Sequence, residues 1–117
     1  MTQMLQRIKL LDESSFHTEL ARSGGIGLVI FSGPDCGACK RLEKYLPEWL
    51  GEQVTHFYKV DVQRSTALAH AYEVFHLPSL FVFINGQYHA PLQAEAAPAA
   101  MAAALKALLA QPAQEEP

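Results

Sequence analysis

Residues 28–40 read LVIFSGPDCGACK, and this stretch decides the fold. Its first four residues form a continuous apolar run that follows a glycine, which is typical of a strand covered on both faces. Residues 32–35, Ser-Gly-Pro-Asp, favour a turn. From Cys39 onward, apolar residues recur at helical spacing. The stretch therefore predicts a buried strand, a turn and an amphipathic helix, with Cys36 and Cys39 where the helix begins.

Those two residues are the only cysteines of the chain, and they lie three positions apart. A structural disulfide stabilises a protein mainly because it closes a long loop in the unfolded chain. A bridge between Cys36 and Cys39 would close only a very short loop. We therefore expect the value of the pair to lie in redox chemistry or in metal binding.

The start of a helix suits the first of these cysteines to nucleophilic chemistry. The N–H groups of the first turn have no partner within the helix, and together with the positive end of the helix dipole they favour an anion. We therefore expect the pKa of the Cys36 thiol to fall. Cys39 lies one helical turn further on, where it can attack a mixed disulfide formed at Cys36.

Strand patterns recur along the rest of the chain. Short apolar or alternating segments predict strands at residues 4–8, 54–60 and 80–84. Asn85-Gly86 is the dipeptide favoured in type I′ turns, so residues 87–92 should return antiparallel as the second strand of a hairpin.

Helix patterns lie between these strands. Asp12 and Ser65 are candidate N-caps, and residues 76–78, His-Leu-Pro, should end the helix that follows Ser65. The Ala-rich stretch 94–110 predicts the last helix, and Pro47 should kink the helix after the cysteines. The side chains expected to face the core are Phe16 and Leu20; Cys39, Leu42, Tyr45, Leu46, Trp49 and Leu50; Leu68, Ala71, Tyr72 and Phe75; and Met101, Ala104, Leu105, Leu108 and Leu109.

These elements follow the order β-α-β-α-β-α-β-β-α, which predicts an α/β fold with a mixed central β-sheet and helices on both faces. We expect one domain over residues 1–110. A polar segment with two prolines follows it over residues 111–117, and we expect this segment to be a flexible tail.

Charge and hydropathy argue against several classes of partner. The net charge is −3, and the sequence has no basic block, so we expect no nucleic acid and no membrane as partner. The first twenty residues contain no apolar run of signal-peptide length, and no segment is apolar enough to span a bilayer. We therefore expect a cytoplasmic protein.

Several segments resemble the thioredoxin family, and the resemblance covers most of the chain. They are the buried strand before the cysteines, Cys-Gly-x-Cys-Lys at 36–40, Lys-Val-Asp-Val at 59–62, Ala-Tyr-Glu-Val at 71–74, Leu-Pro-Ser at 77–79, the strand that leads to Asn85-Gly86 and the C-terminal amphipathic helix.

The resemblance implies a thioredoxin fold and a thiol–disulfide oxidoreductase, with Cys36 as the nucleophile and Cys39 as the resolving cysteine. It also implies that Pro78 follows a cis peptide bond, although a trans turn proline is the default without the family match. The expected partners are protein thiols and disulfides, and a thioredoxin-reductase-like or other dithiol electron donor. No bound cofactor and no metal are implied. The residues expected to contact the substrate are Gly37, Ala38, Leu77 and Pro78.

Two positions of the motif depart from the family pattern. Asp35 stands where thioredoxins usually carry Trp, and its carboxylate should raise the pKa of Cys36, although Asp also suits a plain turn. Ala38 replaces the usual Pro, which should make the couple somewhat more oxidising. The glycine usual near the substrate groove is Ala94 here.

A further departure lies beneath the motif. Ile30 occupies the position of a buried Asp that, in thioredoxins, is paired with a Lys and takes the proton of the second cysteine. The Lys position is kept as Lys59, which either modulates the site or simply extends to solvent. The proton of Cys39 would then pass to water or to another carboxylate.

Other interpretations stay open at this point. The two cysteines could be unreactive thiols, or they could handle a metal or cluster at a dimer interface. Zinc needs four ligands, and the histidines show no ligand spacing to the pair; only His76 is expected near it. The main alternative to an enzyme is a thioredoxin-fold module that binds a partner or acts like a chaperone with little turnover.

Overall fold

The strands and helices follow one another in the order that the sequence predicts. The structure is a computed structural model, and it describes residues 8–117. The elements are β1 (Ile8–Leu11), α1 (Phe16–Arg22), β2 (Ile26–Ser32), α2 (Gly37–Leu50), β3 (His56–Asp61), α3 (Thr66–Ala71), β4 (Ser79–Ile84), β5 (Gln87–Leu92) and α4 (Pro98–Leu109).

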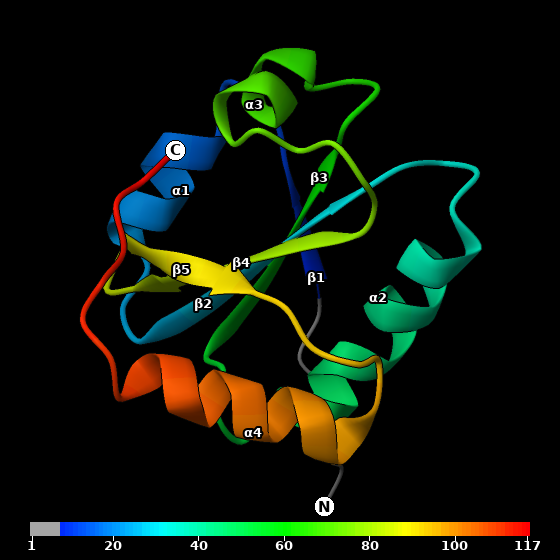
Figure 1. Cartoon of the computed structure of the whole chain (residues 1–117). Helices are drawn as coiled ribbons and strands as arrows, with labels where there is room; N and C mark the ends of the chain where they lie inside the picture. Colours follow the sequence, from blue (N-terminus) through cyan, green and yellow to red (C-terminus); the bar gives the residue numbers. More distant parts are fainter. Residues whose placement is uncertain (1–7) are drawn as a thin grey trace, which may run out of the picture.

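The five strands form one mixed sheet in the order β1-β3-β2-β4-β5. β3 runs parallel to both β1 and β2, whereas β4 is antiparallel to β2 and β5 is antiparallel to β4. Figure 1 shows α2 and α4 on one face of this sheet, and α1 and α3 on the other. The predicted thioredoxin fold is therefore confirmed.

The central strand β2 is buried on both faces, because its side chains alternate between two cores. Leu28 and Ile30 pack against side chains of α2 and α4. Val29 and Phe31 pack against side chains of α1 and α3. A strand covered in this way has no polar face, which explains the continuous apolar run in the sequence.

The predicted hairpin is also confirmed. Asn85 and Gly86 have φ values of 51° and 81°, and positive φ at both central positions is what a type I′ turn requires. β4 and β5 pair antiparallel on either side of the turn. The Asn85 side chain accepts a hydrogen bond from the Gly25 N–H at 2.8 Å, which fixes the turn to the loop before β2.

The described part of the first strand extends beyond the predicted segment. Residues 4–7 of the predicted segment lie outside the described residues, and β1 runs from Ile8 to Leu11. It is an edge strand that pairs only with β3. Leu11 is buried while Leu10 is half-exposed, so the apolar pattern of this short strand is too weak to fix its bounds.

The two predicted N-caps behave differently. The Asp12 carboxylate accepts hydrogen bonds from the N–H groups of Ser14 and Ser15, both at 3.0 Å, in the turn that leads into α1. Hydrogen bonds from the hydroxyls of the same two serines, assisted by those from the N–H groups, hold the pKa of Asp12 below its usual value. The Ser65 side chain makes no capping bond. Instead, Glu13 accepts from the Ala67 N–H at 2.7 Å.

The third helix is shorter than predicted, and it ends at Ala71 rather than near Pro78. Glu73 adopts a left-handed conformation with φ 54°. The Val74 N–H then bonds to the Ala69 carbonyl, which closes the helix in a Schellman motif. Phe75 therefore lies outside the helix, and it is 86% exposed rather than in the core.

Tyr45 and Trp49 of α2 are less buried than predicted: Trp49 packs against the edge of the core, and Tyr45 lies outside it. Both are half-buried, and their rings stack at a centroid distance of 5.7 Å and an interplanar angle of 11°. The buried side of α2 consists of Cys39, Leu42, Leu46 and Leu50. Pro47 lies within α2, which continues to Leu50.

Residues 111–117 form no helix or strand, and their side chains are exposed. The last residues of this segment contact the domain: the Gln114 N–H donates to the His89 carbonyl at 2.7 Å, and Glu116 accepts from the Tyr72 hydroxyl. The segment thus runs from α4 past β5 to the region of α1 and α3 (Figure 1).

Candidate active site

Cys36 is the N-cap residue of α2, and its side chain faces the first turn of that helix. Its backbone is extended, with φ −111° and ψ 101°. The Cys36 Sγ accepts a hydrogen bond from the Cys39 N–H at 3.1 Å. The sulfur therefore occupies the place of a capping oxygen, where an orphan N–H and the helix dipole favour negative charge.

The two cysteines form a disulfide, and their Cα atoms are 5.2 Å apart. Their exposure differs: Cys36 is partly exposed, whereas Cys39 is fully buried. An external thiol or disulfide can therefore reach Cys36 but not Cys39. The two sulfurs therefore differ in their access to an external reagent.

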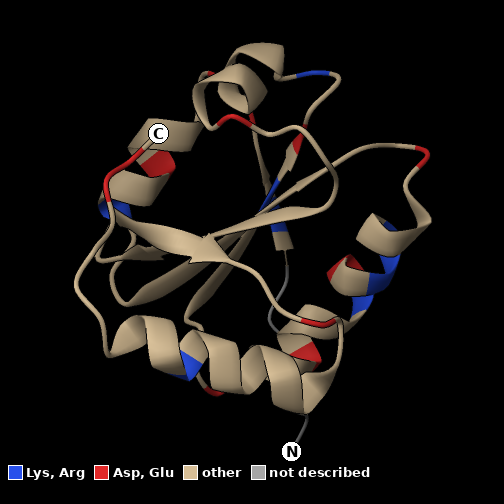
Figure 2. Ribbon diagram, in the orientation of Figure 1, with Lys and Arg blue, Asp and Glu red and all other residues tan. Residues whose placement is uncertain are grey.

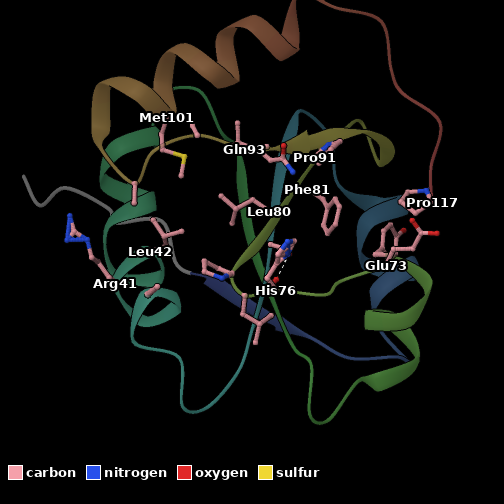
Figure 3. A pocket seen from close by; sticks show the side chains of 18 of the residues that line it. Arg41, Leu42, Glu73, His76, Leu80, Phe81, Pro91, Gln93, Met101 and Pro117 are labelled. Carbon is pink, nitrogen blue, oxygen red and sulfur yellow. Dashed lines mark hydrogen bonds between the residues drawn. The ribbon is translucent and has the colours of Figure 1, made fainter.

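A groove of about 700 Å³ lies beside the motif. Ala38 of α2 lies on its wall, and the loop before β4 contributes Leu77 and Pro78. Gln93 and Ala94, in the loop between β5 and α4, line it further (Figure 3). The groove therefore begins at the cysteine helix and runs over the ends of β4 and β5.

The structure gathers most of the predicted substrate-contacting residues at this groove. Ala38, Leu77 and Pro78 line it, and the Leu77–Pro78 peptide bond is cis, the isomer that the family resemblance implies. Gly37 is exposed at the start of α2 but is not part of the wall. Asp35 is exposed in the loop that precedes Cys36.

Leu77 also touches the loop that carries the cysteines. A Cβ atom built on Gly33 would lie 3.0 Å from the Leu77 Cδ1. Gly33 thus leaves room for the groove wall to approach the chain just ahead of Cys36.

Beneath the motif, Ile30 is fully buried and pairs in register with Lys59 of β3. The Lys59 Nζ lies 3.0 Å from the Glu43 Oε1, and the two side chains are 32% and 21% exposed. Lys59 is therefore not a lysine that simply extends to solvent. Its partner comes from α2, not from the strand position where thioredoxins carry Asp.

Sequence reasoning did not single out Glu43, the partner of Lys59. It lies four residues after Cys39 on the same helix, and residues at this spacing have Cβ atoms about 5–6 Å apart. The signal was the i, i+4 relation between a buried cysteine and a carboxylate. This relation becomes informative only in the structure, where β3 places Lys59 beside Glu43.

Two tyrosines, Tyr72 and Tyr88, line the groove beyond Phe81. Burial raises the pKa of Tyr72 well above its usual value, and the hydrogen bond to Glu116 adds to the shift. Burial also raises the pKa of Tyr88. Both phenols are therefore neutral at physiological pH.

Within residues 8–117, no group of three or more His, Cys, Asp or Glu side chains could hold a metal ion. His76, the histidine expected near the cysteines, is exposed on the groove wall. The helices of this described part are all too short or too polar to cross a bilayer.

Comparisons with known proteins agree with this geometry. A family model described as Thioredoxin matches residues 7–107. The chain is 36% identical over 93 residues to a thioredoxin of Acetoanaerobium sticklandii, which covers 77% of this chain and 88% of that one. It is 33% identical over 82 residues to a thioredoxin of Staphylococcus epidermidis, covering 68% and 76%.

A solved structure supports the fold. Human ERp44 in its zinc-bound form superposes with a TM-score of 0.72 at 22% identity, over 86% of this chain and 32% of that one. The family model and these relatives show that the chain belongs to the thioredoxin family. With Cys36 at the start of α2 and bonded to Cys39, it is a thiol–disulfide oxidoreductase that acts on protein disulfides.

Proposed function

We propose that Cys36 is the nucleophile and Cys39 the resolving cysteine of this oxidoreductase. The observation that carries the proposal is the hydrogen bond from the Cys39 N–H to the partly exposed Cys36 Sγ at the start of α2. This donor stabilises a Cys36 thiolate in the reduced protein, and the thiolate is the nucleophile in disulfide exchange.

The exchange then runs in two steps. The Cys36 thiolate attacks one sulfur of a substrate disulfide; a bond forms between Cys36 and that sulfur, and the other substrate sulfur leaves as a thiolate. Cys39 loses its proton and attacks the Cys36 Sγ, which forms the Cys36–Cys39 bridge and releases the second substrate sulfur. Two electrons pass from the enzyme to the substrate, and the reverse sequence oxidises a dithiol.

The groove is the substrate site in this proposal. Ala38, Leu77 and Pro78 all line the groove, and an extended segment around the substrate disulfide would lie against them. Gly37 adjoins Cys36 at the exposed start of α2. With no side chain, Gly37 lets the substrate backbone approach the sulfur closely.

Glu43 is the proton acceptor that we assign to Cys39. Cys39 is fully buried, so bulk water has poor access to its thiol. Glu43 lies one turn away, and Lys59 pairs with it at 3.0 Å. The ion pair orients the carboxylate between α2 and β3, beside the position where Ile30 offers no polar group. In this role Lys59 modulates the site through Glu43.

Reduction of the Cys36–Cys39 bridge requires a dithiol donor, such as a thioredoxin-reductase-like protein, and we place the enzyme in the cytoplasm. The exchange needs no bound cofactor or metal, because both electrons are stored in the two sulfurs. The Cys39 N–H stabilises a Cys36 thiolate, whereas the Asp35 carboxylate destabilises it, because a negative charge disfavours a neighbouring thiolate.

The test is to trap the intermediate. Cys39→Ser should accumulate a mixed disulfide between Cys36 and a protein substrate such as insulin, and Cys36→Ser should accumulate none. Wild type with dithiothreitol should reduce insulin, and neither variant should do so. A wild type that reduces insulin no faster than Cys36→Ser, yet retains a protein partner without a covalent bond, would instead establish a binding module.

A further inference from the structure

The exposed side of α2 carries a group of cations next to the active site. Lys40, Arg41 and Lys44 lie in its first two turns, and all three are exposed. Figure 2 shows these basic positions gathered on the cysteine end of α2. The first turn holds no acidic residue. Cations at this end oppose the helix dipole, so helix stability does not account for them.

These cations also make no salt bridge to any side chain of the described residues 8–117. The salt bridges of residues 8–117 are Lys9–Glu19 and Lys59–Glu43. Glu48, one turn after Lys44, is exposed and makes no such bridge in this part of the chain. The three cations are therefore open to carboxylates from outside.

Two aromatic rings support the central cation. Arg41, Tyr45 and Trp49 follow one another at i, i+4 and i+8. The Arg41 Cζ lies 5.7 Å from the Tyr45 ring centroid and 5.9 Å from that of Trp49, and the Lys44 Nζ lies 5.3 Å from the Tyr45 centroid. Stacking on a ring leaves the edge of a guanidinium free to bind a carboxylate.

This face joins the substrate groove. Arg41 lines the groove together with Ala38 and Leu42 of the same helix, and Figure 3 shows it on the α2 side. Arg41 thus belongs both to the groove wall and to the group of cations, and Lys44 follows it three residues later on the same helix.

We propose that Lys40, Arg41, Lys44, Tyr45 and Trp49 form a docking face for an acidic protein segment that flanks the substrate disulfide. The inference rests on the proposed function and specifies its substrate class. The chain carries a net charge of −3, so an acidic partner is repelled by the molecule as a whole and attracted at this face. Such a pattern orients the partner and speeds its encounter. Asp35, on the other side of Cys36, opposes the attraction locally.

The test compares the reduced protein on three disulfide peptides that are identical except for three flanking residues, all Glu, all Gln or all Lys. The measured quantity is the second-order rate constant of mixed-disulfide formation. For wild type we expect the Glu peptide to react about tenfold faster than the Lys peptide at low salt, with the ratio shrinking as salt screens the charges. The ratio cancels any change in Cys36 reactivity that a substitution causes.

The double variant Arg41→Gln, Lys44→Gln should bring this ratio close to one. Lys106→Gln, which removes an exposed cation from α4, is the matched control and should keep the wild-type ratio. Tyr45→Leu should lower the ratio part of the way, because Arg41 loses its support; an unchanged ratio would overturn the role of the rings.

Two failures are distinguishable. Equal rates of wild type on the Glu and Lys peptides would overturn the docking face while leaving the oxidoreductase intact. The absence of reaction with all three peptides would overturn the proposed roles of the cysteines.

Discussion

Glu43→Gln tests the account of how the buried cysteine loses its proton. The substitution keeps the size of the side chain but removes its charge and its ability to accept a proton at neutral pH. It also breaks the ion pair with Lys59, whose atoms lie 3.0 Å apart. A partly exposed pair of this kind contributes about 1 kcal/mol or less, so the variant should stay folded.

The effect on the reaction should be larger than the effect on stability. A positioned general base contributes about 10²–10⁴-fold to a proton transfer. Glu43 lies one turn from Cys39, so we expect the lower end of this range. A loss of about 100-fold in the resolution step raises its barrier by about 2.7 kcal/mol. The attack by Cys36 should be nearly unchanged, since its thiolate is stabilised by the Cys39 N–H.

A chromogenic aryl disulfide separates the two steps. The reduced enzyme releases one coloured thiolate when Cys36 attacks and a second when Cys39 resolves the mixed disulfide. In Glu43→Gln the first phase should keep its rate and the second should slow, with a steeper rise with pH because hydroxide must remove the proton. Glu48→Gln, exposed on the same helix, is the control. A second phase as fast as that of wild type would refute the assignment of Glu43.

Three further predictions concern the surroundings of the site. Asp35→Asn should lower the pKa of the reduced Cys36 thiol, because a neighbouring negative charge is removed; the pH profile of iodoacetamide alkylation measures it. The free energy of unfolding should fall as pH rises above about 10, since the unfolded tyrosine ionises there whereas burial keeps Tyr72 protonated to higher pH. Tyr72→Phe should reduce this slope in urea titrations at several pH values. Gly86→Ala should destabilise the fold by about 1–3 kcal/mol, because its φ is +81° and a Cβ would lie 2.5 Å from the Leu20 carbonyl oxygen; an unchanged urea midpoint would contradict this.

Features encoded in local sequence were predictable. The apolar run 28–31 indicated a strand buried on both faces, and its side chains do enter two cores. Asn85-Gly86 indicated a type I′ turn, because few other dipeptides accept positive φ at both positions. The position of Cys36 at the start of a helix followed from the change in apolar spacing at the motif.

Features that depend on contacts between distant segments were not predictable. Glu13 caps α3 from a position 54 residues earlier in the chain. The Glu43–Lys59 pair joins α2 to β3, and neither residue alone signals it. Tyr45 fits the apolar stripe of α2 by spacing, yet its ring lies beneath Arg41. Periodicity identifies a helix face, but it does not distinguish a buried ring from one that supports a cation.

The most direct test of the central claim is the equilibrium of the Cys36–Cys39 pair with glutathione, followed by the mass of the alkylated protein. The account predicts a fully reversible dithiol–disulfide couple with a potential between about −270 and −120 mV, the range of known thiol–disulfide oxidoreductases. A bridge that resists reduction, with a potential below about −300 mV as in structural disulfides, or a pair that never closes, would contradict it.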